Sequence, residues 1–232
     1  IHRVYKIFGP GNQYVTAAKQ FATFHNVAID MPAGPSELLI AADDSAIPSY
    51  IASDLLSQAE HGPDSQVILV TTNLDLIDFV IDEIKKQINL LPRREIMKQA
   101  IANSRMIYFD SNQNAVEFIN AYAPEHYMIC MKNEEYYLRE IENAGSVFIG
   151  NYSPESAGDY ASGTNHILPT NGYAKQYSGL NIDSFLKQMS FQKISVKGIK
   201  NIGPAIEVMA SAEGLDAHKN AVSLRLNDLK NE

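Results

Sequence analysis

The sequence lacks several features that mark whole classes of protein. Its single cysteine, Cys130, excludes an internal disulfide framework, and the apolar run YMICM around it predicts a buried, inert thiol in a reducing compartment. No apolar run approaches the ~20 residues of a membrane helix, so no membrane partner is expected. Nineteen basic and 27 acidic residues give a net charge of -8, without a basic cluster larger than pairs such as Lys85-Lys86. We therefore expect a cytoplasmic protein that does not bind nucleic acid.

The composition is that of a globular protein, with 45% hydrophobic and 20% charged residues among 232. Short apolar runs bounded by turn residues predict buried parallel strands, and patterns of helical spacing lie between them. This alternation predicts an α/β fold with a mainly parallel sheet. The expected strands are 5–9, 27–31, 37–43, 66–72, 105–110, 126–131 and 146–150. The expected helices are 50–60, 76–91, 93–103, 114–122, 134–143, 203–213 and 215–229.

The composition changes after Gly150, where the chain becomes rich in Gly, Ser, Pro and Asn up to about Gly179. Loops of this length in compact domains are usually functional or disordered. Within it, Ser153 and Pro154 resemble the N-cap and first residue of a helix. Two helical patterns follow, with Gly214 as a C-cap between them. We expect a small helical appendage and a boundary near residue 180.

Two glycine-containing loops are weak signals for a ligand. FGPGNQYV follows a strand and opens a helix, where glycines let backbone amides approach a phosphate, and Gly9 and Gly11 supply G-x-G. Tyr14 stands at the position of the third glycine, and Asp30 is the acidic residue nearest the expected spacing. A tight structural turn is the favoured interpretation. The second loop, MPAGPSE, could present Ser36 to a ligand or be a plain connector, which the residues alone favour.

SQAEHGPDSQ places Gln58 and His61 three residues apart at a helix end that Gly62-Pro63 terminates. Their side chains lie on one helical face and could converge on one ion. Imidazole is a common zinc ligand, but a glutamine carbonyl is an unusual one. From spacing alone, an exposed helix end is the better interpretation.

APEH places an acid and a base, Glu125 and His126, at the start of a buried strand. Such a pair could have shifted pKa values and transfer protons. Ligands of α/β sheets normally bind at the carboxyl ends of strands, so topology alone argues against a site here.

Four more polar residues complete the candidates. Asp159 and His166 flank the loop of small residues, and Glu213 and His218 bracket the turn between the last two helical patterns. An ordinary polar helix start is the simpler interpretation of the second pair.

Taken together, these strings resemble the histidinol dehydrogenase family over essentially the whole chain. The resemblance implies oxidation of L-histidinol to L-histidine through L-histidinal, in two NAD-dependent steps at a zinc site. It also implies incomplete Rossmann-like units: the end of one in 1–36, a second, catalytic one in 37–180, and a helical dimerisation domain in 181–232. The strings are GPGNQYV, AIDMPAGPSE, SDLLSQAEHGPDSQVIL, APEH, AGSVFIG, SPESAGDYASGTNHILPT and AHKNAVSLRL.

The resemblance assigns a role to each candidate. It implies that His126 takes the alcohol proton while hydride leaves for NAD, and that Glu125 activates the water that adds to the aldehyde. Asn12 matches a position that contacts NAD. The implied zinc ligands, which also meet substrate, are Gln58, His61, Asp159 and His218. The implied further substrate contacts are Ser36, His126, Glu213 and His166.

Members of this family carry a long portion before the KIFGPGN string, so the resemblance implies that this chain is the C-terminal part of a longer one. The family is a homodimer whose C-terminal piece completes the partner's site. Two alternatives stay open. One is an inactive folded fragment or dimerisation module, which saturable NAD binding would contradict. The other is a zinc hydrolase, which would have no use for a dinucleotide contact at Gly9, Gly11 and Asn12.

Overall fold

The computed structural model describes residues 2–9 and 11–230 of the chain. The chain divides into two compact units, Ile1–Phe185 and Leu186–Glu232. The division falls a few residues after the predicted boundary near residue 180. Phe185 remains with the first unit because its ring stacks on that of Phe8, with the ring centroids 4.4 Å apart.

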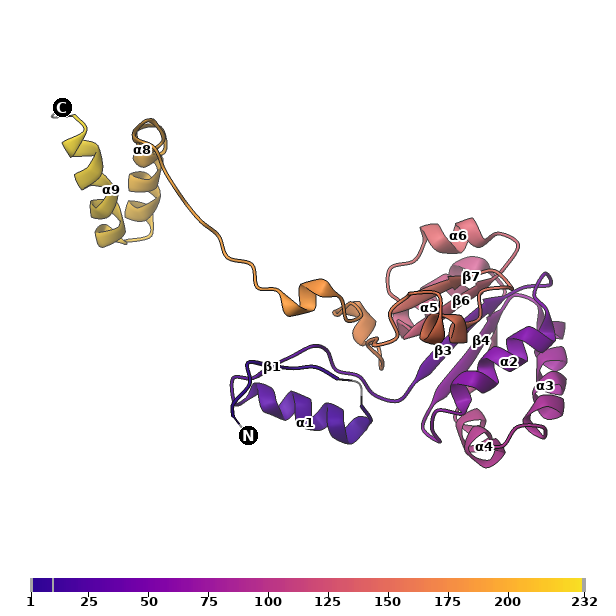
Figure 1. Cartoon of the computed structure of the whole chain (residues 1–232). Helices are drawn as coiled ribbons and strands as arrows, with labels where there is room; N and C mark the ends of the chain where they lie inside the picture. Colours follow the sequence, from indigo (N-terminus) through magenta and orange to yellow (C-terminus); the bar gives the residue numbers. More distant parts are fainter. Residues whose placement is uncertain (1, 10, 231–232) are drawn as a thin grey trace. The chain divides into compact units, whose positions relative to one another are not determined.

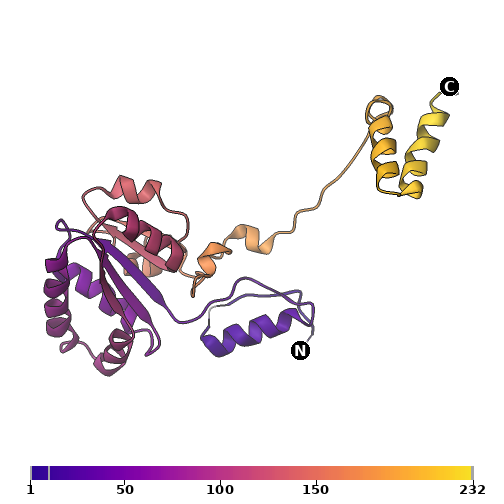
Figure 2. The same ribbon diagram turned by 180° about the vertical axis from the view of Figure 1, so that it is seen from behind.

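A five-stranded sheet forms the centre of the first unit, and its strands run parallel in the order β5-β4-β3-β6-β7 (Figures 1 and 2). All five begin at the predicted residues and end one or two residues earlier than predicted. The prediction of an α/β fold with a mainly parallel sheet is confirmed. The bounds are β3 Glu37–Ala42, β4 Gln66–Thr71, β5 Arg105–Tyr108, β6 His126–Cys130 and β7 Ser146–Ile149.

Helices cover both faces of this sheet (Figure 1). Because successive strand residues point to opposite faces, β3 sends Leu38 and Ile40 into one core and Leu39 and Ala41 into the other. The first core is closed by α2 (Pro48–Ala59), α3 (Leu74–Ile88) and α4 (Arg94–Ala102). The second is closed by α5 (Asn112–Tyr122) and α6 (Glu134–Arg139).

The beginning of the chain forms a separate two-stranded sheet in which β1 (Lys6–Ile7) pairs with β2 (Ala28–Ile29). Helix α1 (Gln13–Thr23) connects the two strands. Each strand is only two residues long, although the sequence predicts five in 5–9 and in 27–31. A strand with a single neighbour has few ladder hydrogen bonds to extend it, which accounts for the difference.

The second unit contains a helical hairpin of α8 (Val196–Ala212) and α9 (Asp216–Asp228). Helix α8 begins seven residues before the predicted Gly203 because the Ser195 hydroxyl caps it, accepting a 3.1 Å hydrogen bond from the Gly198 amide. A side chain at Gly203 would collide with Leu226 of α9, so this glycine lets the two helices approach closely. Gly214, in the left-handed region at φ +72°, turns the chain between them, one residue after the cap residue of α8.

Two expectations about single features can be compared with this fold. Cys130 is buried on β6, and burial raises the pKa of its thiol to about 12, as expected of an inert cysteine. Among the residues that the structure describes, no helix combines the length and the apolar character needed to cross a bilayer.

Candidate functional site

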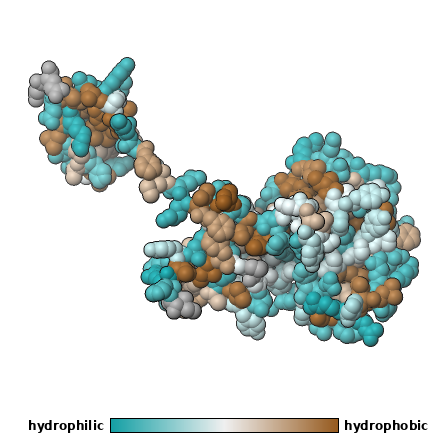
Figure 3. Space-filling view, viewed as in Figure 1, coloured by the Kyte–Doolittle hydropathy of each residue, from teal (hydrophilic) through white to brown (hydrophobic). Residues whose placement is uncertain are grey.

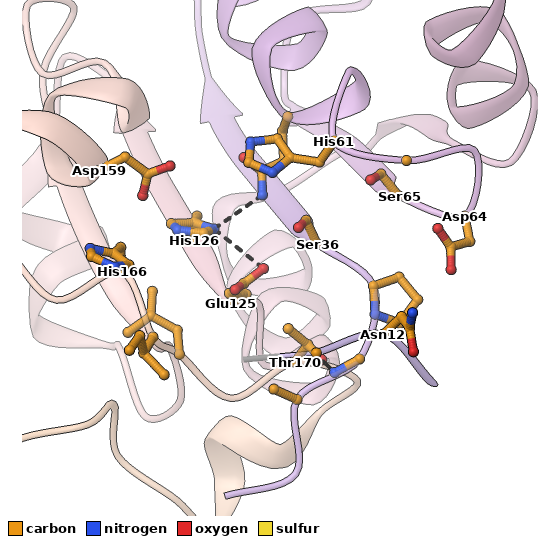
Figure 4. Close-up of a pocket in the computed structure, with 18 residues that line it drawn as sticks. Asn12, Ser36, His61, Asp64, Ser65, Glu125, His126, Asp159, His166 and Thr170 are labelled. Atoms are coloured by element: carbon orange, nitrogen blue, oxygen red, sulfur yellow. Dashed lines mark hydrogen bonds and ion pairs between the residues drawn. The ribbon is translucent and has the colours of Figure 1, made fainter. Parts of the chain in front are cut away.

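A pocket of about 340 Å³ opens in the first unit where β3 and β6 begin (Figure 4). Helix α2 runs back antiparallel to β3, so its last turn lies near the N-terminal ends of the strands, where the pocket opens. The topological expectation of a site at the carboxyl ends of the strands is therefore wrong for this pocket. The predicted residues that line it are Asn12, Ser36, Gln58, His61, Glu125, His126, Asp159 and His166.

The acid and base of the APEH string are held by the main chain of β3. The Glu37 amide donates a 2.8 Å hydrogen bond to Oε2 of Glu125, and the Glu37 carbonyl lies 3.0 Å from Nδ1 of His126. A carbonyl can only accept, so Nδ1 carries a proton and donates it to this bond. The register of the sheet sets both contacts, because His126 pairs with Leu38.

Carboxylates surround the buried His126 ring. Oε2 of Glu125 lies 3.5 Å from Nδ1, and Oε1 of Glu155 lies 3.6 Å from Nε2. Burial by itself lowers the pKa of His126, but Glu125, Glu155 and the Glu37 carbonyl outweigh burial and raise that pKa to about 9. Burial raises the pKa of Glu155 and that of Glu37 to about 7.

Gln58 lies in the last turn of α2 and His61 two residues after the end of that helix, and both line the pocket. Figure 4 shows His61 at the pocket wall. The Gln58 side chain is buried, and its Nε2 lies 3.5 Å from Nδ1 of His126. Its carbonyl oxygen Oε1 is buried without a hydrogen-bond partner in the described part of the chain. An orphaned buried oxygen is costly, and a cation would satisfy it. His61 is exposed at the pocket wall.

The short helix α7 (Glu155–Tyr160) carries Asp159 to the opposite wall. Gly158 permits this, because a side chain there would come within 2.7 Å of the Phe148 ring on β7. The prediction of Ser153 as N-cap and Pro154 as first helical residue is wrong by one position: Pro154 is the cap residue. The Ser153 hydroxyl instead donates a 2.7 Å bond to the Ile149 carbonyl.

Glu155 was missed by the sequence analysis, although it stands four residues before Asp159 and therefore on the same face of α7. Its side chain is buried, and its Oε1 has no hydrogen-bond partner among the described residues. Ligand atoms of His126, Glu155 and Asp159 lie within 4.8 Å of one another, close enough to hold a metal ion together. This set shares only Asp159 with the four ligands that the resemblance implies.

The segment after His166 closes the pocket from another side. The Thr170 hydroxyl accepts a hydrogen bond from the Gly34 amide, and the Asn171 amide donates a 2.8 Å bond to Oε1 of Glu37. Glu37 therefore has two roles. Its side chain holds the segment at Asn171, and its main chain holds Glu125 and His126. The sequence analysis also missed three polar residues that line the pocket, Asp64, Ser65 and Thr170.

The FGPGNQYV turn is held by the side chains of Asn12, Lys19 and Asp30. The Asn12 carbonyl oxygen caps α1, accepting from the amides of Tyr14 and Val15 at 3.0 and 3.2 Å. Asp30 forms a buried 2.5 Å ion pair with Lys19 and accepts a 2.8 Å bond from the Gly9 amide. Asp30 is therefore engaged in the fold and cannot bind a ribose without breaking this pair, which agrees with a structural turn.

Glu213 and His218 belong to the second unit, where they line one small cavity of about 240 Å³. Glu213 ends α8 and His218 lies in the first turn of α9, so the turn at Gly214 brings them to the same concave surface. The other residues around it are Ile206, Met209, Ala210 and Leu215.

Comparison with known proteins gives a consistent result. A family model described as histidinol dehydrogenase matches residues 1–226. The histidinol dehydrogenase of Bacteroides fragilis (strain YCH46) is 58% identical over 230 residues, 99% of this chain and 54% of that protein. The chloroplastic histidinol dehydrogenase of Arabidopsis thaliana is 56% identical over 232 residues, 98% of this chain and 50% of that protein.

A solved structure shows the same arrangement. The crystal structure of histidinol dehydrogenase from Elizabethkingia anophelis matches with a TM-score of 0.95 and 58% identity, covering 99% of this chain and 53% of that one. The chain spans about half the length of the curated relatives it matches.

Proposed function

Because the chain belongs to the histidinol dehydrogenase family, we propose that it forms part of an enzyme that oxidises L-histidinol to L-histidine through L-histidinal. The hydride acceptor in both steps is NAD. The observation that carries this proposal is the buried Glu125-His126 pair, held by the main-chain N–H and carbonyl of Glu37 at the wall of a pocket large enough for a small substrate. The remaining half of the enzyme's length would supply the rest of the dinucleotide site.

The donors at the pocket fit a zinc ion. Gln58 offers a carbonyl oxygen without a partner, His61 an accessible imidazole and Asp159 a carboxylate, all around one cavity. His218 of the second unit is the proposed fourth ligand, and Glu213 beside it a proposed substrate contact. When bound, zinc would hold the amino and imidazole nitrogens of histidinol without changing its own redox state.

His126 is the proposed base for alcohol oxidation. Loss of hydride from carbon requires loss of the hydroxyl proton, and in the neutral ring Nε2 has the free lone pair because Nδ1 donates to Glu37. The neutral form is favoured when neighbouring donors such as Gln58 and Asp159 hold a cation, because like charges repel.

Glu125 is the proposed base for the second half of the reaction. The Glu37 amide fixes Oε2 of its carboxylate at 2.8 Å, and Glu125 lines the pocket. Accepting a proton from water would help that water add to the aldehyde, and the hydrate would then lose a second hydride. Ser36 and His166 line the same pocket and are proposed to contact substrate, and Asn12 is proposed to contact NAD.

The test uses the complete enzyme containing this chain, with zinc content and NADH formation from L-histidinol measured together. We expect His61→Ala to lose zinc and activity. His126→Asn should retain zinc but lower kcat by about 100- to 10,000-fold, the usual contribution of a general base. The exposed His25 provides a matched control, and His25→Ala should change neither quantity.

Two results would contradict the proposal. The first is absence of NADH formation by the complete enzyme at saturating histidinol and NAD. The second is full zinc occupancy in His61→Ala, which would remove His61 from the metal site. Hydrolysis of an ester without NAD would instead favour a zinc hydrolase.

A further inference from the structure

Glu155 is a buried acidic residue to which the proposed function gives no role. Its side chain is only 2% exposed, and Oε1 has no hydrogen-bond partner among the described residues. Burying a carboxylate is costly unless a charge or a donor compensates it. The group that faces this oxygen is Nε2 of His126, 3.6 Å away.

The two sides of the His126 ring have different surroundings. On the Nδ1 side, the ring faces the Glu37 carbonyl at 3.0 Å and Glu125 at 3.5 Å. On the Nε2 side, the Glu155 carboxylate lies 3.6 Å away, and a carboxylate oxygen of Asp159 lies within 4.8 Å of both the His126 ring and Glu155. Nδ1 is already committed to the Glu37 carbonyl, so Nε2 is the nitrogen that would exchange a proton with substrate. Glu155 is therefore next to the atom on which the proposed chemistry depends.

The position of Glu155 follows from how α7 is seated. The close contact of Gly158 with the Phe148 ring presses α7 against β7, and the Phe148 and His126 rings lie with centroids 6.0 Å apart. Glu155 and Asp159 are one helical turn apart, so the same helix face brings both carboxylates to the His126 ring.

We propose that Glu155 is a positioning residue of this site, whose buried carboxylate fixes the orientation of the His126 ring from its Nε2 side. The inference rests on the proposed function, because it assigns to Glu155 a role in the proton transfer by His126. When Nε2 carries a proton, the Glu155 carboxylate accepts a hydrogen bond from that N–H and so fixes the orientation of the His126 ring. In Glu155→Gln a neutral amide would replace the carboxylate, and the His126 Nε2–H would have no anionic acceptor.

A kinetic experiment on the complete enzyme tests this role. We expect Glu155→Gln to lower kcat by about 10- to 100-fold, the usual effect of removing a partner that orients a functional histidine. KM for histidinol and zinc content should stay unchanged, and Glu155→Asp should recover part of the loss. Glu135 is an exposed acidic residue on α6, and Glu135→Gln is the matched control that should change nothing.

A double variant shows whether Glu155 acts through His126. If it does, Glu155→Gln costs little in a His126→Asn background, because the orienting partner has no ring to orient. An equal loss in both backgrounds would overturn the proposal, as would an unchanged kcat. Loss of zinc in Glu155→Gln would also overturn it, and would make Glu155 a metal ligand together with Asp159.

A second measurement separates this inference from the proposed function. In the chain labelled with ¹⁵N-histidine, the His126 Nε2 resonance is identified by its absence in His126→Asn. We expect this resonance to move in Glu155→Gln and to stay in place in Glu135→Gln. An unmoved resonance overturns the contact. If the contact is present but the parent enzyme forms no NADH from histidinol, the proposed function has failed and the assignment of Glu155 to orienting His126 stands.

Discussion

At the scale of single residues, the Lys19-Asp30 pair shows how a candidate ligand contact can be a structural element. Both side chains are almost fully buried, 2.5 Å apart, and the Lys19 ammonium also donates a 2.8 Å bond to the Gly9 carbonyl. Asp30 in turn accepts from the amides of Gly9 and Met31. The pair therefore ties the turn before α1 to the end of β2.

This pair predicts a pH dependence of stability. Burial opposes ionisation of Asp30, but Lys19 and the two amides outweigh it and hold the pKa of Asp30 below its usual value of 3.8. Since the folded pKa is the lower one, the stabilisation is present above the unfolded pKa and is lost as the pH falls through the folded pKa. We expect the free energy of unfolding in urea to fall in that acidic range.

Asp30→Asn should flatten this dependence. It should also cost about 3–5 kcal/mol at neutral pH, because Lys19 would remain buried without its partner. Asp78 is exposed on α3 and has no ion pair in the described part of the chain, so Asp78→Asn is the control and should follow the parent curve. If the unfolding free energy of Asp30→Asn depended on pH in the same way as that of the parent protein, the Lys19-Asp30 pair would not contribute to the pH dependence of stability.

Single residues also show where sequence reasoning reaches its limit. Gln58 and His61 were recognised as sharing a helical face, but their spacing could not show that Asp159 lies across a pocket from them. The orphaned Oε1 of Gln58 and the buried Glu155 are properties of packing between distant segments, and no local pattern encodes them. The strings that resemble a family identified the candidates, and the fold brought eight of them to one cavity.

At the scale of elements, periodicity predicted the long strands and helices and failed where an element is short. The five central strands begin where their apolar runs begin. The three inner strands, β3, β4 and β6, are buried on both faces, whereas the edge strands β5 and β7 are partly exposed. Helix α7 has only six residues, many of them small, so it carries no helical pattern of apolar residues. It was expected only as a possible helix start, and its cap was placed one residue too early.

Helix α7 provides a prediction at this scale. In Gly158→Ala the new methyl group would meet the Phe148 ring at 2.7 Å and the Thr164 hydroxyl at 2.8 Å, so α7 must shift. We expect a loss of about 1–3 kcal/mol in unfolding free energy, as for other overpacked sites. Zinc affinity of the complete enzyme should also fall, because Asp159 moves with the helix.

A second substitution makes the cause of these losses visible. Phe148→Leu removes the ring atoms that the methyl group would strike but leaves the Thr164 hydroxyl in place, so the double variant should recover part of the stability and zinc affinity that Gly158→Ala alone loses. Strictly additive losses would mean that Gly158 is required for another reason than contact with Phe148.

At the scale of the whole molecule, two residues that are proposed for the site lie in the second compact unit. Glu213 and His218 lie in the helical unit, which also exposes apolar side chains such as Val208, Met209 and Leu224. Hydrophobic surface is visible on this unit in Figure 3. Exposed apolar surface of this kind is typical of a protein interface, as the homodimer implied by the family resemblance would require.

Mixed dimers test whether the helical unit serves the partner subunit. Complete chains carrying His61→Ala are refolded together with chains carrying His218→Ala, each inactive alone. If His218 completes the partner's site, each mixed dimer contains one intact site, and random pairing restores about a quarter of the parent activity. If each site is built within one subunit, the mixture stays inactive. As the control, each variant is refolded by itself under the same conditions and should stay inactive.

The contacts of Glu37 with Glu125 and His126 have a consequence for how this site tolerates mutation. Both are made by the main chain of the first residue of β3, one by its N–H and one by its carbonyl, and they follow from the pairing of β3 with β6. The alignment of acid and base is therefore independent of the side chain at position 37. The buried pairing of β3 with β6 sets the positions of Glu125 and His126. Substitutions elsewhere in the pocket walls can therefore change the pocket while this pair stays aligned.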